Sequence, residues 1–132
     1  MKNLLIAGSR SFDDFNRLSF MVVELLKITK LSEIIIISGG AKGADSLAER
    51  FAKENKIPFT LFKAKWDLYG KKAGILRNEE MGRFSDLLLA LWDGESKGTK
   101  HMINFMLDLK KPVYVDIFRE NNKKPLRVTK NT

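Results

Sequence analysis

Four consecutive isoleucines within residues 33–38 constrain the fold more than any other stretch of the sequence. A strand with one solvated face alternates apolar and polar residues, whereas an unbroken apolar run predicts a strand that is buried on both faces. Such a strand needs a covering layer on each side, which is typical of parallel sheets in α/β proteins. Further short apolar runs predict strands at residues 3–7, 59–62, 86–92 and 112–118. We therefore predict a Rossmann-like three-layer α/β domain with a mostly parallel, five-stranded sheet.

Apolar residues at helical spacing separate the predicted strands. They indicate helices at residues 13–30, 72–84 and 101–109, and one whose inner face is Leu47, Ala48, Phe51 and Ala52. Because right-handed crossovers make such strands parallel, their carboxyl ends meet at one edge of the sheet. Ligands bind beyond that edge, near the point where the strand order reverses. Three glycine-bearing loops fall there, at residues 8–10, 39–45 and 93–99.

The charge of the chain is unevenly distributed. Its 132 residues carry 24 Lys and Arg against 16 Asp and Glu, a formal net charge of +8. Half of this excess lies in residues 119–132, which hold five basic residues and one acidic residue. We therefore predict a mildly basic domain at residues 1–118 and a basic, flexible C-terminal tail at residues 119–132. Mild basicity suits a small anionic ligand as well as a nucleic acid.

Several classes of protein are excluded by residues that the chain lacks. It has no Cys, which rules out disulfides, Cys-based zinc sites and thiol catalysis and makes the cytoplasm the default compartment. No apolar run approaches the roughly 18 residues that span a bilayer, so we expect no membrane partner. The single His, His101, has no other potential metal ligand at a suitable spacing in the sequence, and we interpret it as structural or solvent-facing. We expect neither a metal nor a cofactor.

Residues 39–43, Gly-Gly-Ala-Lys-Gly, lie between a predicted strand and a predicted helix. Glycines there let backbone N–H groups approach an anion, and the helix amino terminus adds partial positive charge. The alternative is a tight turn whose glycines only provide positive φ angles. We favour anion binding, because a turn needs one or two glycines and this loop has three. Asp45, in the first helical turn, either interacts with the helix dipole, braces the loop or accepts a sugar hydroxyl.

Other candidates lie at the same predicted edge of the sheet. Ser9 and Arg10 follow the first strand, and Arg suits bidentate phosphate contacts, although a solvated surface Arg is the alternative. Arg77 belongs to a charged helical stretch that either is a solvated face or points over this edge. Residues 94–99 form either a second anion cradle or a flexible turn in which Thr99 caps the next helix.

The combined signature is made of Gly8-Ser9-Arg10, Ser38-Gly39-Gly40-Ala41-Lys42-Gly43-Ala44-Asp45, Trp66, Gly74, Arg77-Asn78, Met81, Asp93-Gly94 and Gly98-Thr99. Together these positions resemble the YspA/CpYpsA-related SLOG family over residues 4–116. The wider SLOG superfamily joins cytokinin-activating phosphoribohydrolases of the LOG type with the DNA-processing protein DprA. The resemblance implies a Rossmann-like fold and a nucleotide or nucleotide-derived ligand. Because SLOG relatives are often dimers, it also implies a homodimer or a higher homo-oligomer.

The chain departs from the LOG enzymes at the positions that carry their catalysis. LOG enzymes have Arg-Lys-x-x-Met and Pro-Gly-Gly-x-Gly-Thr-x-x-Glu motifs, whose Arg and Glu are catalytic. Arg77 aligns with the first motif, but Asn78 replaces its Lys, and Met102 stands where the second motif has its Glu. Cleavage of a glycosidic bond needs a carboxylate near the sugar, which Met cannot supply. We therefore do not expect LOG-type hydrolysis; if the protein is an enzyme, Arg77 and Glu80 are the candidate catalytic residues.

The main hypothesis is a protein that binds, and so senses or sequesters, a nucleotide-derived phosphorylated ligand such as a mononucleotide or an ADP-ribose-like molecule. The alternatives are a nucleotide N-glycosidase and a single-stranded DNA-binding protein. DNA binding is suggested because residues 38–45 are similar to the DprA stretch Ser-Gly-x-Ala-Arg-Gly-x-Asp. The sequence shows no clear basic track with aromatic residues for a strand. The predicted ligand-binding residues are Gly8, Ser9, Arg10, Ser38, Gly39, Gly40, Ala41, Lys42, Gly43, Asp45, Trp66, Arg77, Asn78, Asp93, Gly94, Ser96, Gly98 and Thr99.

Overall fold

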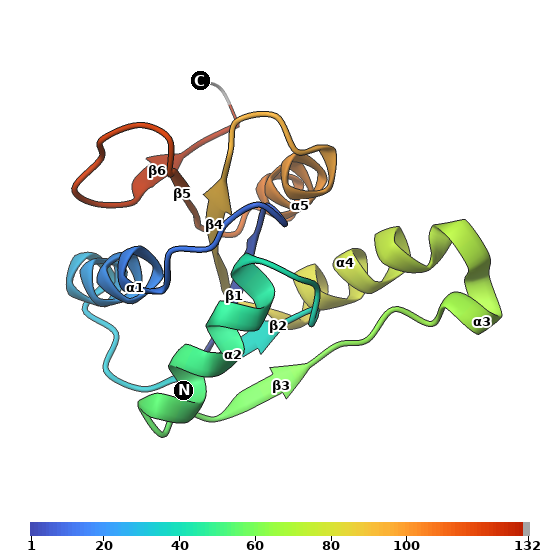
Figure 1. Cartoon of the computed structure of the whole chain (residues 1–132), viewed down its shortest axis with the longest axis horizontal. Coiled ribbons are helices and arrows are strands. Elements are labelled where there is room, and N and C mark those ends of the chain that lie inside the picture. Colours follow the sequence, from blue (N-terminus) through green and yellow to red (C-terminus); the bar gives the residue numbers. More distant parts are fainter. Residues whose placement is uncertain (131–132) are drawn as a thin grey trace.

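A six-stranded sheet forms the centre of the computed structural model, which describes residues 1–130 (Figure 1). Its strand order is β3-β2-β1-β4-β5-β6. The strands are β1 (Lys2–Gly8), β2 (Ile34–Ser38), β3 (Phe59–Leu61), β4 (Leu87–Trp92), β5 (Val113–Ile117) and β6 (Leu126–Val128). All neighbouring strands are parallel except β5 and β6, which are antiparallel. The order reverses between β1 and β4, because the chain builds outward from β1 to β3 on one side and from β4 on the other.

Helices cover both faces of the sheet. They are α1 (Phe15–Thr29), α2 (Ala44–Glu54), the short α3 (Trp66–Tyr69), a 3-10 helix η1 (Gly70–Lys72), α4 (Ala73–Phe84) and α5 (Lys97–Asp108). The buried side chains of α1 and α2 join one apolar cluster, and those of α4 and α5 join a second one on the other face. The three-layer Rossmann-like prediction is therefore confirmed. None of the helices within residues 1–130 is long and apolar enough to cross a membrane.

The isoleucine run behaves as predicted. Ile36 and Ile37 are both fully buried, but Ile36 joins the cluster beneath α1 and α2 while Ile37 joins the cluster beneath α4 and α5. Successive side chains of a strand point to opposite faces, so an unbroken apolar run fits only a sheet that is covered twice. Leu4 and Leu5 of the neighbouring β1 divide between the two clusters in the same way.

The prediction of five strands was wrong by one strand. The sixth strand, β6, comes from the segment that the sequence assigned to the tail, and it pairs with β5 at the edge of the sheet. The connection is tied down by Arg17, which donates to Asp116 at 2.7 Å and to the carbonyls of Glu120 and Asn122. The strand was missed because three half- or fully exposed residues carry no burial pattern. Residues 131–132 of the predicted tail lie outside the described residues.

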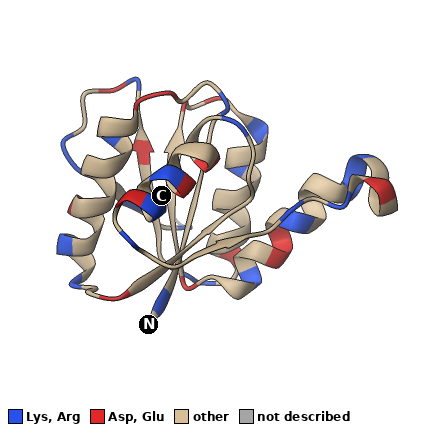
Figure 2. Ribbon diagram, turned by 60° about the horizontal axis from the view of Figure 1, so that its bottom comes forward, with Lys and Arg blue, Asp and Glu red and all other residues tan. Residues whose placement is uncertain are grey.

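One part of the chain projects beyond the layered body. After β3 the chain runs outward, turns through α3 and η1 and returns along α4 (Figures 1 and 2). We call residues 62–76 the arm. The sequence predicted a loop through Trp66 and Gly70 in this region, and the structure shows that this loop contains a short helix and a 3-10 turn. Four lysines, Lys63, Lys65, Lys71 and Lys72, belong to the arm, and stretches of blue ribbon mark them in Figure 2.

Candidate ligand-binding cleft

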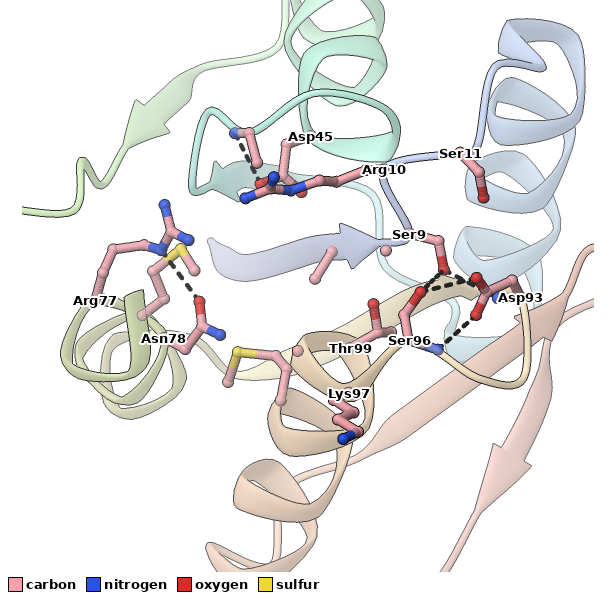
Figure 3. Close-up of a pocket in the computed structure, with 16 residues that line it drawn as sticks. Ser9, Arg10, Ser11, Asp45, Arg77, Asn78, Asp93, Ser96, Lys97 and Thr99 are labelled. Atoms are coloured by element: carbon pink, nitrogen blue, oxygen red, sulfur yellow. Dashed lines mark hydrogen bonds between the residues drawn. The ribbon is translucent and has the colours of Figure 1, made fainter. Parts of the chain in front are cut away.

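A cleft of about 620 Å³ opens at the carboxyl edge of the sheet, where the strand order reverses between β1 and β4 (Figure 3). This is the position at which open α/β sheets bind ligands. The end of β1 and the loop after it form its centre, the loop and first turn of α5 form one wall, and α4 faces the start of α2 across it. It is lined by Ala7, Gly8, Ser9, Arg10, Ser11, Ala41, Asp45, Arg77, Asn78, Met81, Asp93, Ser96, Lys97, Gly98, Thr99 and Met102.

Three polar side chains join the loops that follow β1 and β4. The Ser9 hydroxyl accepts a hydrogen bond from the backbone N–H of Asp93 at 3.0 Å and lies 2.9 Å from the Ser96 hydroxyl. Ser96 in turn donates to the Asp93 carboxylate at 2.8 Å. Backbone N–H groups of Ser96 and Glu95 also donate to this carboxylate, and they lower the pKa of Asp93 to about 2. Asp93 is therefore an ionised group that fixes the shape of this wall.

Helix α5 begins closer to β4 than the sequence indicated. Its first residue is Lys97, so Gly98 and Thr99 belong to its first turn, and the N-cap residue is Ser96. The predicted start at residue 101 was therefore too late, and the alternative in which Thr99 caps the helix is not what the structure shows, because Asp93 organises the loop into a turn that starts the helix earlier. The Ser96 side chain makes no capping bond, since it is engaged with Ser9 and Asp93. The first N–H groups of a helix have no intrahelical partner, and this end of α5 borders the cleft.

The loop between β2 and α2 is braced from within by Asp45. Its carboxylate accepts the backbone N–H of Ala41 at 3.1 Å, and the Ser38 hydroxyl accepts the N–H of Gly40. Asp45 is 8% exposed, and burial raises its pKa to about 6, although the Ala41 N–H and the nearby Arg77 and Arg10 oppose this rise. These contacts are those of a brace for the loop, and Asp45 also lies in the first turn of α2, near the helix amino terminus.

Arg77 reaches the same loop from α4. Its Nη1 donates to the carbonyl of Gly39 at 2.8 Å, and its Nε donates to the side chain of Asn78 at 3.1 Å. A Cβ atom on Gly39 would lie 2.9 Å from the guanidinium, so the glycine makes room for the arginine. Burial lowers the pKa of Arg77, while the neighbouring Asp45 opposes this effect. The guanidinium therefore lies against the loop and faces the cleft (Figure 3).

Packing also requires glycine at other positions of this loop. Gly43 has a φ of 81°, and a Cβ atom there would lie 2.4 Å from the Ser9 carbonyl oxygen. Gly40 has a φ of 73° and faces Leu61. The loop thus has to be glycine-rich in order to fit between β3, the Ser9 loop and Arg77. The count of glycines alone does not distinguish an anion cradle from a tightly packed turn.

The structure brings together most of the predicted residues. Those that line the cleft are Gly8, Ser9, Arg10, Ala41, Asp45, Arg77, Asn78, Asp93, Ser96, Gly98 and Thr99. Those that do not line it are Ser38, Gly39, Gly40, Lys42, Gly43, Trp66 and Gly94. Trp66 is 55% exposed on the arm, where its ring lies next to Gly74. Glu80, named as a candidate catalytic residue, lines a neighbouring groove and not this cleft.

The list of predicted binding residues left out five residues that line the cleft: Ala7, Ser11, Met81, Lys97 and Met102. Two of them had nevertheless been noted, Lys97 within the candidate cradle at residues 94–99 and Met81 within the family signature. Met81 and Met102 are both buried and form an apolar part of the lining. The comparison with LOG motifs contained a signal for Met102, because it placed a catalytic carboxylate at that position. For Lys97 the signal was the glycine loop beside it, once the start of α5 is known.

Three cations, Arg10, Arg77 and Lys97, border the cleft, and its two carboxylates accept backbone N–H groups. This arrangement suits an anion that carries an apolar or aromatic part, which the methionines can contact. Within residues 1–130 no three acidic or His side chains gather in a way that could hold a metal ion.

Comparisons with known proteins agree with this architecture. The DNA processing protein A (DprA) of Streptococcus pneumoniae is similar in structure, with a TM-score of 0.71 and 14% identity over 87% of this chain. The chain spans 50% of that protein. DprA from Helicobacter pylori, whose structure is described as revealing a unique single-stranded DNA binding mode, gives a TM-score of 0.67 and 17% identity. That match covers 92% of this chain and 69% of the other. At these identities the similarity shows the fold.

Sequence similarity is more specific. The Gene 61 protein of Mycobacterium phage D29 is 37% identical, over 76% of this chain and 85% of the phage protein. Residues 3–69, which include β1, the braced glycine loop and the start of the arm, match the model of a known family. The chain belongs to the YspA, cpYpsA-related SLOG family.

Proposed function

We propose that the cleft binds a nucleotide-derived phosphorylated ligand, such as a mononucleotide or an ADP-ribose-like molecule, and that the protein senses or sequesters it. The observation that carries this proposal is the placement of Arg10, Arg77 and Lys97 around one cleft whose carboxylates accept backbone N–H groups. Pockets of about 300–1,000 Å³ suit small ligands, and this cleft is within that range. We place this activity in the cytoplasm, the default compartment for a chain without Cys.

The chemistry of the walls suggests how such a ligand lies. The amino terminus of α5, with Lys97 and Gly98, suits a phosphate group, because unpaired N–H groups and the helix dipole favour negative charge there. Arg10 and Arg77 on the opposite side suit a second anionic or polar group. Met81 and Met102, which line the same cleft, suit the face of a base.

The test is thermal unfolding in the presence of AMP, ADP, ADP-ribose, NAD and cyclic nucleotides. A ligand at about 100 times its dissociation constant stabilises the fold by about 2.7 kcal/mol, which gives a clear rise in Tm. Lys97→Met should lower the affinity by about tenfold, since it removes a cation beside the phosphate. Lys100→Met is the matched control, because Lys100 is an exposed residue of the same helix that does not line the cleft. Equal losses in the two variants, or no shift with any ligand, would contradict the proposal.

We propose binding without turnover. A nucleotide N-glycosidase needs a carboxylate beside the sugar, and the position that LOG enzymes use is the buried Met102. Glu80 points to the neighbouring groove, while Asp45 and Asp93 accept backbone N–H groups. Incubation with each nucleotide should release no free base above the uncatalysed rate. Base release that disappears in Glu80→Gln would establish the hydrolase instead.

Nucleic acid is the second candidate partner. The H. pylori DprA, which shares this fold, is described as binding single-stranded DNA, and residues 38–45 are similar to a DprA motif. A single strand of nucleic acid would need more cationic surface than the cleft alone provides.

A further inference from the structure

We infer that the groove next to the cleft is a second subsite for a phosphodiester backbone, so that the nucleotide bound in the cleft is the end of a single-stranded oligonucleotide that runs past Arg77 into the groove. This inference rests on the proposed function of the cleft. The groove measures about 280 Å³ and is lined by Lys63, Lys65, Tyr69, Ala73, Leu76, Arg77, Glu80 and Arg83.

The groove adjoins the cleft at Arg77. Arg77 lines both hollows, and it lies on α4 between them. Its guanidinium is held in place by the Gly39 carbonyl and Asn78, so a chain of phosphates that leaves the cleft on this side meets a fixed cation. The outward segment of the arm then supplies Lys63 and Lys65 along the same path.

The charge of the groove favours a polyanion. Four cations line it against one carboxylate, that of Glu80. Within residues 1–130, Lys63 and Lys65 form no ion pair, whereas the cations of α2 do: Arg50 pairs with Glu54, and Lys53 with Glu49. Lysines that form no ion pair and lie along one path can bind successive phosphates of a nucleic acid backbone.

The groove also offers surfaces on which bases can stack. Tyr69 is 50% exposed and Leu76 is 38% exposed, and both line it. Trp66 is exposed nearby on the same short helix as Tyr69. Exposed aromatic rings beside a cationic path are what single-strand-binding proteins use, because every base has a face that can stack. The sequence alone did not show this track, since its cations come from two segments that only the fold brings together.

The experiment compares the binding of thymidine monophosphate with that of the hexanucleotide dT6, and of rU6 in parallel to distinguish DNA from RNA. The groove variant is Lys63→Ser with Lys65→Ser. The charge-matched control is Lys123→Ser with Lys124→Ser, two exposed lysines in the connection to β6. The cleft variant is Lys97→Met. Fluorescence anisotropy measures the oligonucleotides, and calorimetry measures the mononucleotide.

We expect wild-type protein to bind dT6 or rU6 at least tenfold more tightly than the mononucleotide in low salt. The groove variant should lose about tenfold for the oligonucleotide and keep its mononucleotide affinity within twofold. Its salt slope should also fall by about 1.4, because each lost contact to a single strand contributes about 0.7. The control should change neither affinity, and Lys97→Met should weaken both.

Other results overturn the inference and leave the proposed function standing. These are equal binding of mononucleotide and oligonucleotide, or equal losses in the groove and control variants. Self-association that Tyr69→Ser abolishes while oligonucleotide binding is unchanged also overturns it, because the groove would then be a contact between copies of the chain. Absence of mononucleotide binding together with retained oligonucleotide binding contradicts the proposed function instead.

Discussion

The cleft and the arm carry similar residue types in opposite structural settings. At the cleft, a Cβ atom on Gly8 would lie 2.3 Å from the carbonyl oxygen of Leu91, and Ser9 is 2% exposed within a hydrogen-bond network. On the arm, a Cβ atom on Gly70 would have no neighbour within 4 Å, and Leu68 is 72% exposed. The sheet thus fixes the geometry of one region, whereas few tertiary contacts hold the other.

This difference teaches which parts of a ligand each region can recognise. Groups held by packing and hydrogen bonds are preorganised, and they select a ligand of fixed shape. Exposed cations and rings on a projecting segment instead accept a repeating, flexible ligand, because no single geometry is imposed. Arg77 lies where the two regions meet, since its guanidinium is bonded to Gly39 and the residue lines both the cleft and the groove beside the arm.

The largest expected effect follows from replacing the glycine at the end of β1. In Gly8→Ala the new methyl group would meet the Leu91 carbonyl at 2.3 Å and the Ala44 side chain at 2.7 Å. Because the first of these is backbone of the neighbouring strand, β1 and β4 have to move apart as well as α2, and we expect a loss of about 3 kcal/mol in the free energy of unfolding. Urea unfolding followed by circular dichroism measures this loss.

The matched control for this variant is Gly98→Ala in the first turn of α5, where a Cβ atom has no neighbour within 4 Å. It should be neutral or raise stability by about 0.5 kcal/mol, because alanine restricts the unfolded chain. If the two variants were equally stable, the end of β1 would accommodate a side chain, and the sheet would not fix the geometry of the cleft as the comparison with the arm requires.

Much of the fold could be predicted from local pattern. The isoleucine run predicted a sheet covered on both faces, because a strand that is buried on both faces is apolar at every position. Helical spacing of apolar residues predicted the alternation of strands and helices. The strand β6 shows no such pattern, since it is short and at an edge where Leu126 and Arg127 stay exposed. The connection that leads to it is held by Arg17, from a distant segment, which bonds Asp116 and the carbonyls of Glu120 and Asn122.

The candidate site could be predicted only as far as its loops. The rule for parallel sheets placed residues 8–10, 39–45 and 93–99 together, and each of these loops contributes to the cleft. Which atoms face the ligand depends on long-range contacts. Arg77 lies 38 positions from Gly39 in the sequence and donates to its carbonyl. Gly39, predicted to contact an anion, therefore packs against the guanidinium of Arg77, for which its missing side chain leaves room. The groove depends on the path of the arm, for which the sequence had no pattern.

A second prediction concerns the pH dependence that the buried Asp45 creates. Its pKa is about 6 in the folded protein against 3.8 ordinarily, so between these values the folded state holds more protons than the unfolded state. Stability should therefore fall as the pH rises from about 4 to about 6, by up to about 3 kcal/mol at 1.36 kcal/mol per unit. Asp45→Asn keeps an acceptor for the Ala41 N–H and removes the charge, and we expect it to flatten this fall.

The measurement is urea unfolding of both proteins at several pH values between 4 and 7. Above pH 6 the Asn variant should be the more stable of the two. Parallel curves for the two proteins would mean that Asp45 is solvated in solution, and the cleft would then be less rigid than the comparison with the arm assumes.

The smallest expected effect is on the arm. Leu68 is 72% exposed, so Leu68→Ala removes little buried surface and should change the free energy of unfolding by less than about 0.5 kcal/mol. Leu5→Ala, in a fully buried position of β1, should lose about 3 kcal/mol in the same experiment. Both are measured by urea unfolding at two protein concentrations.

A loss above about 1 kcal/mol for Leu68→Ala that grows with concentration would show that the arm is buried against another copy of the chain, because only an associating surface makes stability depend on concentration. A small loss in the free energy of unfolding that does not depend on protein concentration means that the arm is free to contact a nucleic acid.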